Sequence, residues 1–337
     1  MAKSLVLSGI AVLVLAGPAL AAEVPEACNS HTAAVTGGPL PPPDSDTVVI
    51  RWLGNANFEF AHKGKVYLFD AYFDRTPRSH ALGFKAADVA KAEAIFVSHA
   101  HFDHISDIGP VARQTGARVV GAPITIETAK KLSAPENQLV VAKGGESMPF
   151  GDATVEIALA QHSTIQAGLT DIYASLYKND APPYSEEETR ELARVRSLGT
   201  FDPKVITEGT LAYALTFPSG FKAVLVGSAG PITPGVRALA EKLGPVDVAV
   251  VAYQVHAVAA TQIEYTWPLI ALFKPKLFLP AHHDAAPPAW VDLGLEPLFD
   301  KIRAEMPGTA FLAPLYRSPI CVAGAGPEKG RVVSFKY

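Results

Sequence analysis

Residues 97–104 read VSHAHFDH, and they follow directly on a short apolar segment, Ala94–Val97, that we expect to be a buried strand. A loop that leaves a strand in this way directs several side chains into one small volume. Three imidazoles and one carboxylate form a ligand set that suits zinc, and also iron or manganese. A solvated loop that happens to be rich in histidine is the alternative, and the apolar lead-in argues against it. We therefore predict a metal centre with the candidate ligands His99, His101, Asp103 and His104.

Apolar runs on both sides of this segment predict two β-rich halves, each with helices of its own. In the first half, strands are expected at 47–52, 57–60, 66–69, 94–97, 119–120, 139–141 and 154–158, and a helix at 124–132. In the second half, strands are expected at 211–217, 223–226, 248–251 and 277–279, and helices at 236–243 and 262–273. Two sheets packed face to face, with helices outside, satisfy this pattern.

The H-x-H-x-D-H pattern after a strand resembles the metallo-β-lactamase superfamily, and the resemblance covers the chain from about Thr47 to Leu315. Trp52–Ala56 and Leu68–Asp70 look like two motifs of the branch that contains ascorbate-6-phosphate lactonase. The resemblance implies an α/β protein, a four-layer αββα sandwich that holds one or two divalent metal ions between its sheets. It also implies two ligand sets, which are His99 and His101 with a later histidine, and Asp103 and His104 with a final histidine.

Two later histidines match the remaining ligand positions of that family. His162 follows a predicted strand within ALAQHS, residues 158–163, and its order after the first motif suggests the third ligand of the first metal. His282, within LFLPAHHD at residues 277–284, aligns with the final ligand of the second metal. His283 is the alternative ligand there, with His282 orienting it. In the favoured register, His283 and Asp284 are candidates for groups that orient a ligand.

Two positions depart from the family pattern. In VLVGSAG, residues 224–230, Ser228 stands where the family places an aspartate that bridges the two metals. A neutral hydroxyl is a weaker ligand than a carboxylate, so we expect tight binding of one metal at the first site and a weaker or empty second site. Asp284 or another carboxylate could replace the bridge. Asn55 is the second departure, because many members of the lactonase branch have histidine there.

Four further residues follow predicted strands at the edge of the sheets where the metals are expected. Tyr253 and His256 come after the strand at 248–251. Arg75 and Arg78 come after the strand that leads to Asp70, and they could meet an anionic substrate. Residues of these types are more often ordinary packing or surface residues. The sequence leaves both interpretations open.

Hydrolysis is the activity that the ligand set and the resemblance favour. We expect a metal-activated water to attack an ester, lactone or phosphoester of a small-molecule substrate, and Asp103 to act as the catalytic group that orients this water or transfers its proton. A serine hydrolase based on Ser228 is a weaker alternative, because GSAG lacks the G-x-S-x-G spacing. A non-catalytic metal-binding or sensing protein of the same fold is the other alternative.

The N-terminal residues differ in composition from the rest. Residues 1–21 combine a positively charged start, an apolar run over Leu5–Gly17 that is too short for a membrane span, and the pattern Ala19-Leu20-Ala21, as in a signal peptide. Cleavage there predicts a periplasmic or secreted protein without a membrane anchor, and a retained anchor is the alternative. Residues 22–46, rich in proline and glycine, predict an extended segment without helix or strand. Residues 47–337 then form one metallo-β-lactamase-fold domain.

Residues 171–205 interrupt the order of strands and predict a helical insertion. Ser185 and Glu188 form a capping box that opens an amphipathic helix ending near Leu198. Such an insertion could be a lid, a dimer contact or a solvated surface helix. The solvated surface helix is the default interpretation, although long insertions near a site are often functional.

The cysteine pair bears on the cellular compartment of the protein, and the charge balance bears on its binding partners. Cys28 and Cys321 could form a disulfide in an oxidising compartment, with two unpaired buried thiols as the alternative. The formal net charge is −4 at pH 7, and the chain contains no basic tract, so a nucleic-acid partner is not expected. No segment after residue 21 is long and apolar enough to span a membrane.

Overall fold

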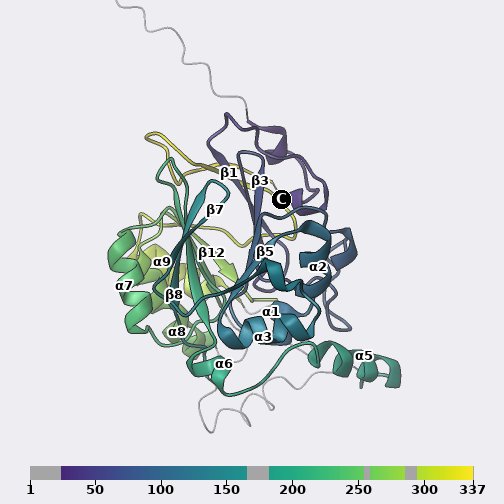
Figure 1. Ribbon diagram of the computed structural model, residues 1–337. Coiled ribbons are helices and arrows are strands. Elements are labelled where there is room, and N and C mark those ends of the chain that lie inside the picture. Colours follow the sequence, from purple (N-terminus) through teal and green to yellow (C-terminus); the bar gives the residue numbers. More distant parts are fainter. Residues whose placement is uncertain (1–23, 165–181, 254–258, 285–293, 337) are drawn as a thin grey trace, which may run out of the picture.

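Two β-sheets lie face to face between two layers of helices (Figure 1). The computed structural model describes residues 24–164, 182–253, 259–284 and 294–336. The first sheet has eight strands in the order β15-β14-β1-β2-β3-β4-β5-β6, and the second has seven in the order β13-β12-β11-β10-β9-β8-β7. This arrangement is the αββα sandwich that the sequence predicts.

The strands of each sheet come mainly from one half of the chain. The first sheet consists of β1 Thr47–Trp52, β2 Phe58–His62, β3 Lys65–Phe69, β4 Ala94–Phe96, β5 Arg118–Gly121, β6 Leu139–Val141, β14 Ile320–Ala323 and β15 Val332–Phe335. The second consists of β7 Ser147–Phe150, β8 Ala153–Leu159, β9 Leu211–Thr216, β10 Lys222–Val226, β11 Val248–Ala252, β12 Leu277–Ala281 and β13 Ala310–Phe311.

The helices flank both sheets. Those that follow strands of the first sheet are α1 Phe102–Ile105, α2 Ile108–Thr115 and α3 Pro123–Lys131. Those on the second sheet are α7 Pro234–Leu243, α8 Ala259–Phe273 and α9 Glu296–Glu305. Short 3-10 helices are η1 Glu26–Cys28, η2 Ala34–Thr36, η3 Ala86–Asp88 and η4 Glu136–Gln138. In the described part of the chain, none of the helices has the length and apolar character of a membrane span.

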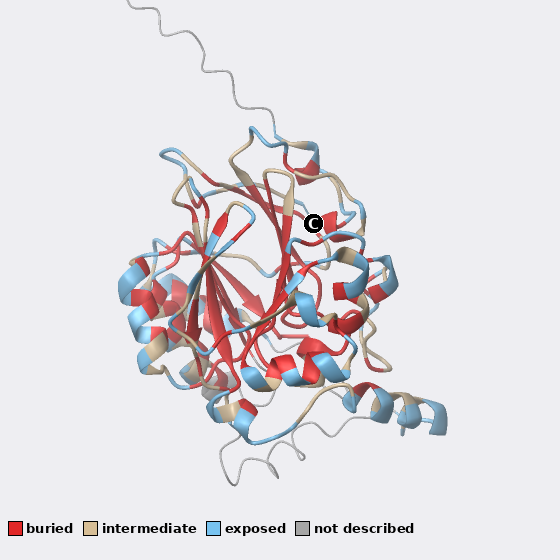
Figure 2. Cartoon of the chain, viewed as in Figure 1, coloured by how far each residue is buried: buried red, intermediate tan, exposed pale blue. Residues whose placement is uncertain are grey.

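The sheets are buried on both faces because successive side chains of a strand point to opposite sides. In β1, Val48 and Ile50 join the core between the two sheets, whereas Val49 faces the helices that cover the first sheet. The outer face of the second sheet is buried in the same way, by α7 to α9. Figure 2 shows the result, with buried strands in the centre and exposed surface on the outer sides of the helices.

Several elements were not expected from the sequence, and β14 and β15 matter most among them. These strands come from the end of the chain but extend the first sheet beside β1, with Val49 opposite Cys321. Each has only four residues, so its local pattern is weak, and the pairing with β1 is what makes it a strand. The strand β7 and the helices α2 and α9 were also missed.

The segment before β1 is folded onto the first sheet. Cys28 and Cys321 form a disulfide with a Cα–Cα distance of 5.8 Å, so the paired alternative holds. The expectation of an extended segment without helix is wrong in detail, because η1 buries Ala27 and Cys28 and η2 buries Ala34 and Val35 in the core against the sheet. Apolar burial therefore overrides the loop-like composition. The predicted signal peptide, residues 1–21, lies outside the described residues.

A buried ion pair holds the same segment. Arg51 Nη1 lies 2.7 Å from Glu59 Oε1, and both side chains are fully buried. Arg51 Nη2 donates to the carbonyl oxygen of Ala27, and Val35 N donates to Glu59 Oε2, both at 2.7 Å. The two charges thus meet each other and the backbone of the N-terminal segment, as buried charges require.

The predicted helical insertion is described from residue 182 onward. It contains α5 Glu186–Arg196 and α6 Lys204–Thr207. Glu188 N donates to Ser185 Oγ at 3.1 Å and Ser185 N donates to Glu188 Oε2 at 2.8 Å, which confirms the capping box. In Figure 1, α5 projects from the body of the molecule, and its exposed charges follow from this position.

Candidate metal centre

The H-x-H-x-D-H loop lies at one end of the sandwich, where it contacts both sheets. Its strand, β4, runs parallel to β3 and β5, so the carboxyl ends of the three strands share this edge. Leu211 N in the second sheet donates to Ser98 O at 2.8 Å, and Tyr213 Oη donates to Val97 O at 2.8 Å. These bonds bring the loop of the first sheet against the second sheet.

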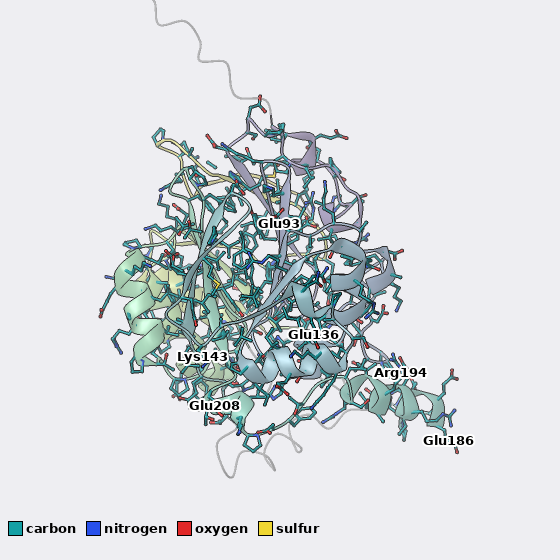
Figure 3. All side chains as sticks on the ribbon, viewed as in Figure 1. Glu93, Glu136, Lys143, Glu186, Arg194 and Glu208 are labelled. Atoms are coloured by element: carbon teal, nitrogen blue, oxygen red, sulfur yellow. A yellow bond between two sulfur atoms is a disulfide. The ribbon has the colours of Figure 1, made fainter. Side chains whose placement is uncertain are left out.

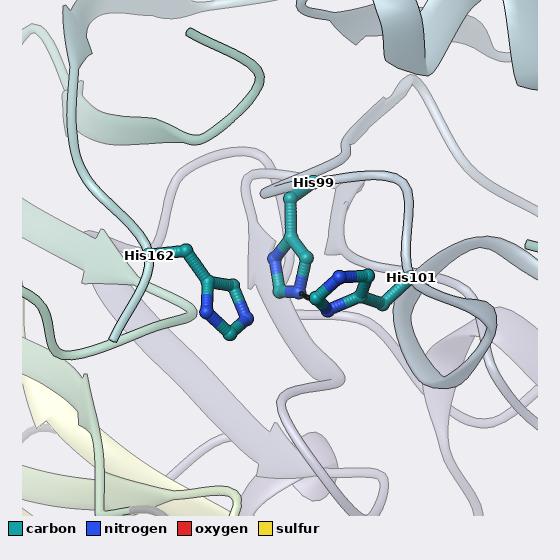
Figure 4. A group of neighbouring side chains, drawn as sticks. All are labelled: His99, His101 and His162. Carbon is teal, nitrogen blue, oxygen red and sulfur yellow. Dashed lines mark hydrogen bonds between the residues drawn. The ribbon is translucent and has the colours of Figure 1, made fainter. Parts of the chain in front are cut away.

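A first cluster consists of His99, His101 and His162. One ring nitrogen of each lies within 4.8 Å of the others. His162 comes from the loop after β8 in the second sheet, while the other two come from the loop after β4 in the first, and their rings converge (Figure 4). Residues from facing sheets thus form a candidate site for one metal ion.

The imidazoles of this cluster are suited to remain neutral. Burial, together with the neighbouring imidazoles, holds the pKa of His99 well below its usual range. Burial and the nearby His101 lower the pKa of His162 to about 3. Neutral imidazole is the form that binds a metal. The cluster can therefore offer nitrogen lone pairs at neutral pH.

A second cluster consists of Asp103, His104 and His282, again with candidate ligand atoms within 4.8 Å of one another. His282 Nε2 lies 3.1 Å and His104 Nε2 lies 3.7 Å from Asp103 Oδ2. Although burial opposes ionisation, the imidazoles of His104 and His282 hold the pKa of Asp103 well below its usual range. This cluster joins one carboxylate to two imidazoles.

Asp70 and Ser98 together form hydrogen bonds with one histidine of each cluster, a role that we did not predict. Asp70, at the end of β3, is fully buried and accepts hydrogen bonds from Ser98 N at 2.6 Å, Ser98 Oγ at 2.9 Å and His104 Nδ1 at 2.7 Å. Burial raises the pKa of Asp70, and its carboxylate raises that of His104 against the effect of burial. A carboxylate directly after a buried strand beside β4 was the signal in the sequence.

The hydrogen bonds of the histidines test whether the residues fit a metal. Nδ1 of His104 donates to Asp70, and Nδ1 of His162 donates to Ser163 O at 2.6 Å. Nδ1 of His99 lies 3.0 Å from Ser98 Oγ, which can accept because its own proton goes to Asp70. Nε2 of His104 is buried without a hydrogen-bond partner among the described residues. Histidine ligands typically bond in this way through their second nitrogen, so the residues fit a metal ion.

Asn55 connects the β1–β2 turn to the second cluster. Its Nδ2 donates to Asp103 O at 2.6 Å and lies 3.5 Å from Asp103 Oδ2. Its backbone oxygen accepts from His282 N at 2.8 Å, and its backbone nitrogen donates to Asp284 Oδ1 at 2.9 Å. The position that departs from the family pattern therefore holds two residues of this cluster in place.

The two residues that follow His282 in the sequence have other roles. His283 stacks on Trp52 with ring centroids 4.4 Å apart, so it lies outside the cluster that contains His282. Asp284 pairs with Arg75 Nη1 at 2.8 Å and accepts from Tyr316 Oη at 2.5 Å. This buried ion pair holds the Asp284 carboxylate away from the role of a bridge. It also assigns Arg75 a partner within the fold.

Ser228 lies beside the first cluster, at the end of β10. Its side chain is buried, and its Oγ accepts from Ser163 N at 3.1 Å, one residue after His162. Ser228 thus lies next to the residue that follows His162, and it offers a hydroxyl group instead of a carboxylate. No carboxylate other than Asp103 belongs to the two clusters among the described residues.

The remaining candidates are not brought into the clusters. Arg78 forms an ion pair with Glu188 at 2.7 Å and so binds the start of α5. Tyr253 is buried, and its backbone nitrogen donates to Ala281 O at 2.8 Å. His256 lies outside the described residues. Their placement favours the packing interpretation for Arg78 and Tyr253.

The fold and the two clusters define a protein of the metallo-β-lactamase type. Residues 65–283 match the family model described as the beta-lactamase superfamily domain. The match covers more than half of the chain, and the chain belongs to this superfamily.

Individual relatives are similar over shorter stretches. A metal-dependent hydrolase of Chloroflexus aurantiacus is 33% identical over 118 residues, which cover 35% of this chain and 48% of the relative. A metal-dependent hydrolase of Solibacter usitatus is 32% identical over 138 residues, covering 40% and 55%. The chain thus spans about half the length of the curated relatives it matches.

Solved structures share the fold at low identity. A metallo hydrolase from Ignicoccus hospitalis superposes with a TM-score of 0.55 at 14% identity, covering 82% of this chain and 98% of that one. The diiron β-hydroxylase CmlA from Streptomyces venezuelae gives 0.50 at 15% identity, covering 85% and 55%. Identities this low support the fold alone.

Proposed function

We propose that this protein is a metal-dependent hydrolase of small ester, lactone or phosphoester substrates. The observation that carries the proposal is the convergence of His99, His101 and His162 from two facing sheets, with Nδ1 of His99 and Nδ1 of His162 already bonded to the protein. The metal-dependent hydrolases among the relatives support the same activity. The resemblance of Trp52–Ala56 to the lactonase branch supports an ester or lactone.

The first cluster would hold one metal ion. The second cluster would hold another if its negative charge offsets the repulsion between two divalent ions. A divalent ion in such a site supplies Lewis acidity, which polarises an electrophilic carbonyl or phosphoryl group and makes water a nucleophile near neutral pH. Zinc suits three imidazoles, and manganese or iron are alternatives. Ser98 and Asp70 fix the tautomers of His99 and His104, so that Nε2 of each faces the site.

Asp103 is the residue we assign to proton transfer. Its side chain is 19% exposed, against 1% for His104 and 3% for His282, so it is the most accessible member of the second cluster. Asn55 fixes its backbone, and His282 holds one carboxylate oxygen. A carboxylate held in this way can orient a water molecule and accept its proton.

The proposal is tested by metal analysis and turnover on the same preparation. Elemental analysis should find at least one equivalent of zinc, manganese or iron per chain. Turnover of a panel of lactones, carboxylic esters and phosphodiesters should stop when a chelator removes the metal and return when it is restored. Turnover that survives complete removal of the metal would contradict the proposal and would favour a serine hydrolase.

Ser228 favours one alternative, a non-catalytic metal-binding protein. The loss of the bridging carboxylate would be expected if the chemistry had been lost while metal binding remained. The same experiment separates the two functions. Full metal content without turnover on any member of the panel would support the binding protein.

We also propose that the protein acts in the periplasm or is secreted. The signal-like features of residues 1–21 support export, and the Cys28–Cys321 disulfide suits an oxidising compartment. Fractionation of cells that express the full chain should place it outside the cytoplasm, with a mature N-terminus near residue 22. A cytoplasmic protein that retains Met1 would contradict this.

A further inference from the structure

The segment that follows α5 packs directly on the H-x-H-x-D-H loop. Thr200 N donates to Ala100 O at 2.8 Å, between His99 and His101 in the sequence. A Cβ atom at Gly199 would lie 2.2 Å from Phe102 N, so only glycine permits this approach. The insertion is therefore fixed to the loop that supplies four candidate ligands.

The other end of the insertion is fixed as well. Arg78 Nε and Nη2 bind the two carboxylate oxygens of Glu188 at 2.7 and 2.8 Å, and Arg78 Nη1 donates to Pro182 O at 2.7 Å. Between these anchors, Glu186 lies at the outer end of α5, away from the body of the molecule (Figure 3). This outer end is solvated, and the segment at 199–201 lies close to the site.

Phe201 is the side chain that this segment places beside the first cluster. Its ring centroid lies 5.2 Å from that of His101 and 6.1 Å from that of Phe102. The guanidinium group of Arg196 lies 5.4 Å from the centre of the same ring. Phe201 nevertheless remains 55% exposed. A large aromatic surface, held in place but open to solvent, therefore adjoins a candidate metal ligand.

We propose that Phe201 forms an apolar wall of the substrate site and selects substrates with an aromatic group next to the bond that is cleaved. The proposal rests on the proposed hydrolase function for its reaction, but not for the binding itself. Stacked and edge-to-face aromatic contacts have centroid distances of about 4.5–7 Å. The Phe201 ring lies 5.2 Å from that of His101, so a substrate ring in contact with Phe201 would lie no more than about 12 Å from His101, centroid to centroid.

The size of the expected effect follows from the contact that would be lost. Removal of the ring would lose both the aromatic contact and the burial of its exposed part, so discrimination for an aromatic substrate should weaken roughly tenfold.

The experiment compares two lactones that share a six-membered ring, dihydrocoumarin with its fused benzene ring and δ-valerolactone without it. In Phe201→Ala, we expect kcat/KM for dihydrocoumarin to fall roughly tenfold relative to δ-valerolactone. Phe201→Leu, which keeps apolar area but no ring, should have an intermediate effect. Val333→Ala is the matched control, because Val333 is 46% exposed and lies on the edge strand β15.

A binding measurement separates this proposal from the proposed function. The product acid, 3-(2-hydroxyphenyl)propanoate, is titrated calorimetrically into metal-loaded wild type, Phe201→Ala and Val333→Ala. Weaker binding in Phe201→Ala alone supports the wall, even if neither lactone is hydrolysed and the hydrolase proposal fails. Equal binding in all three proteins, no measurable binding, or hydrolysis with an unchanged preference between the lactones would overturn the wall. Metal content that is equal in all three proteins excludes an indirect effect through His101.

Discussion

The two clusters differ in charge and in how they are held. The first consists of His99, His101 and His162, three imidazoles without a carboxylate. The second contains Asp103 and is braced by Asp70 behind His104 and by Asn55 at Asp103 and His282. The comparison shows two neighbouring clusters that differ in their carboxylates. Ser228, the residue at the expected ligand position, supplies a hydroxyl group, while Asp70 and Asn55 supply hydrogen bonds to the second cluster.

Electrostatics predicts unequal affinities from this difference. Two divalent ions a few ångströms apart repel each other strongly, and a bridging carboxylate would offset the repulsion with negative charge. Ser228 offers no charge, and Asp284 is held by Arg75 and Tyr316. We therefore expect one tightly bound metal at the first cluster and a second that dialysis removes.

The largest effect is expected from the first cluster. His99→Ala or His101→Ala removes one of three nitrogen ligands, so the tight metal should be lost and hydrolysis should fall to background. Metal content and kcat/KM are measured on the same samples. His31→Ala, at an exposed histidine outside both clusters, should behave as wild type. Full metal content in either first-cluster variant would contradict the ligand assignment.

Restoring the carboxylate should reduce the difference between the clusters. Ser228→Asp adds charge and two donor oxygens, and a unit charge pair about 4 Å apart gains about 4 kcal/mol at an effective dielectric constant of 20. Desolvation of the buried aspartate offsets part of this, so we expect the second equivalent to bind about a hundredfold more tightly. Metal titration of the apo-protein measures it. If the native protein holds two metals equally well, another ligand replaces the bridge.

The support behind His104 should affect the second cluster more than the first. Asp70→Asn keeps the shape and tolerates the positive φ of 58° at this position, but it removes the charge that orients His104 Nδ1–H. Loss of such a partner typically weakens metal affinity about 10- to 100-fold. The titration should show this loss in the second equivalent. An equal loss in both equivalents would mean that Asp70 supports the whole loop through Ser98.

The smallest effect is expected at Asn55. Asn55→Gly removes the amide that donates to Asp103 and tolerates the φ of 51°, so backbone strain is avoided. One neutral hydrogen bond is worth about 1 kcal/mol, which predicts about fivefold weaker binding of the second metal. Retention of the tight first equivalent is the internal control. No change in the second equivalent would limit Asn55 to shaping the turn.

The sequence was most informative where the functional residues are close together in the chain. The loop at 97–104 concentrates four candidate ligands after one apolar strand, and both features are local. The helices α3 and α7 were also predicted, because apolar spacing is a property of a short window. Motif order then suggested His162 and His282 at positions that the fold brings to the same edge.

Only the tertiary structure decided the contacts between distant segments. The sequence allowed the disulfide of Cys28 and Cys321 but did not choose it, and the pairing of β14 with β1 joins residues more than 250 positions apart. The bond from His104 to Asp70 and the contact of Phe201 with His101 are of the same kind. A local pattern specifies whether a residue is in a strand and which face it occupies. The partner of that residue depends on the packing of the whole sandwich, because apolar burial on both faces of each sheet fixes the positions of all strands together.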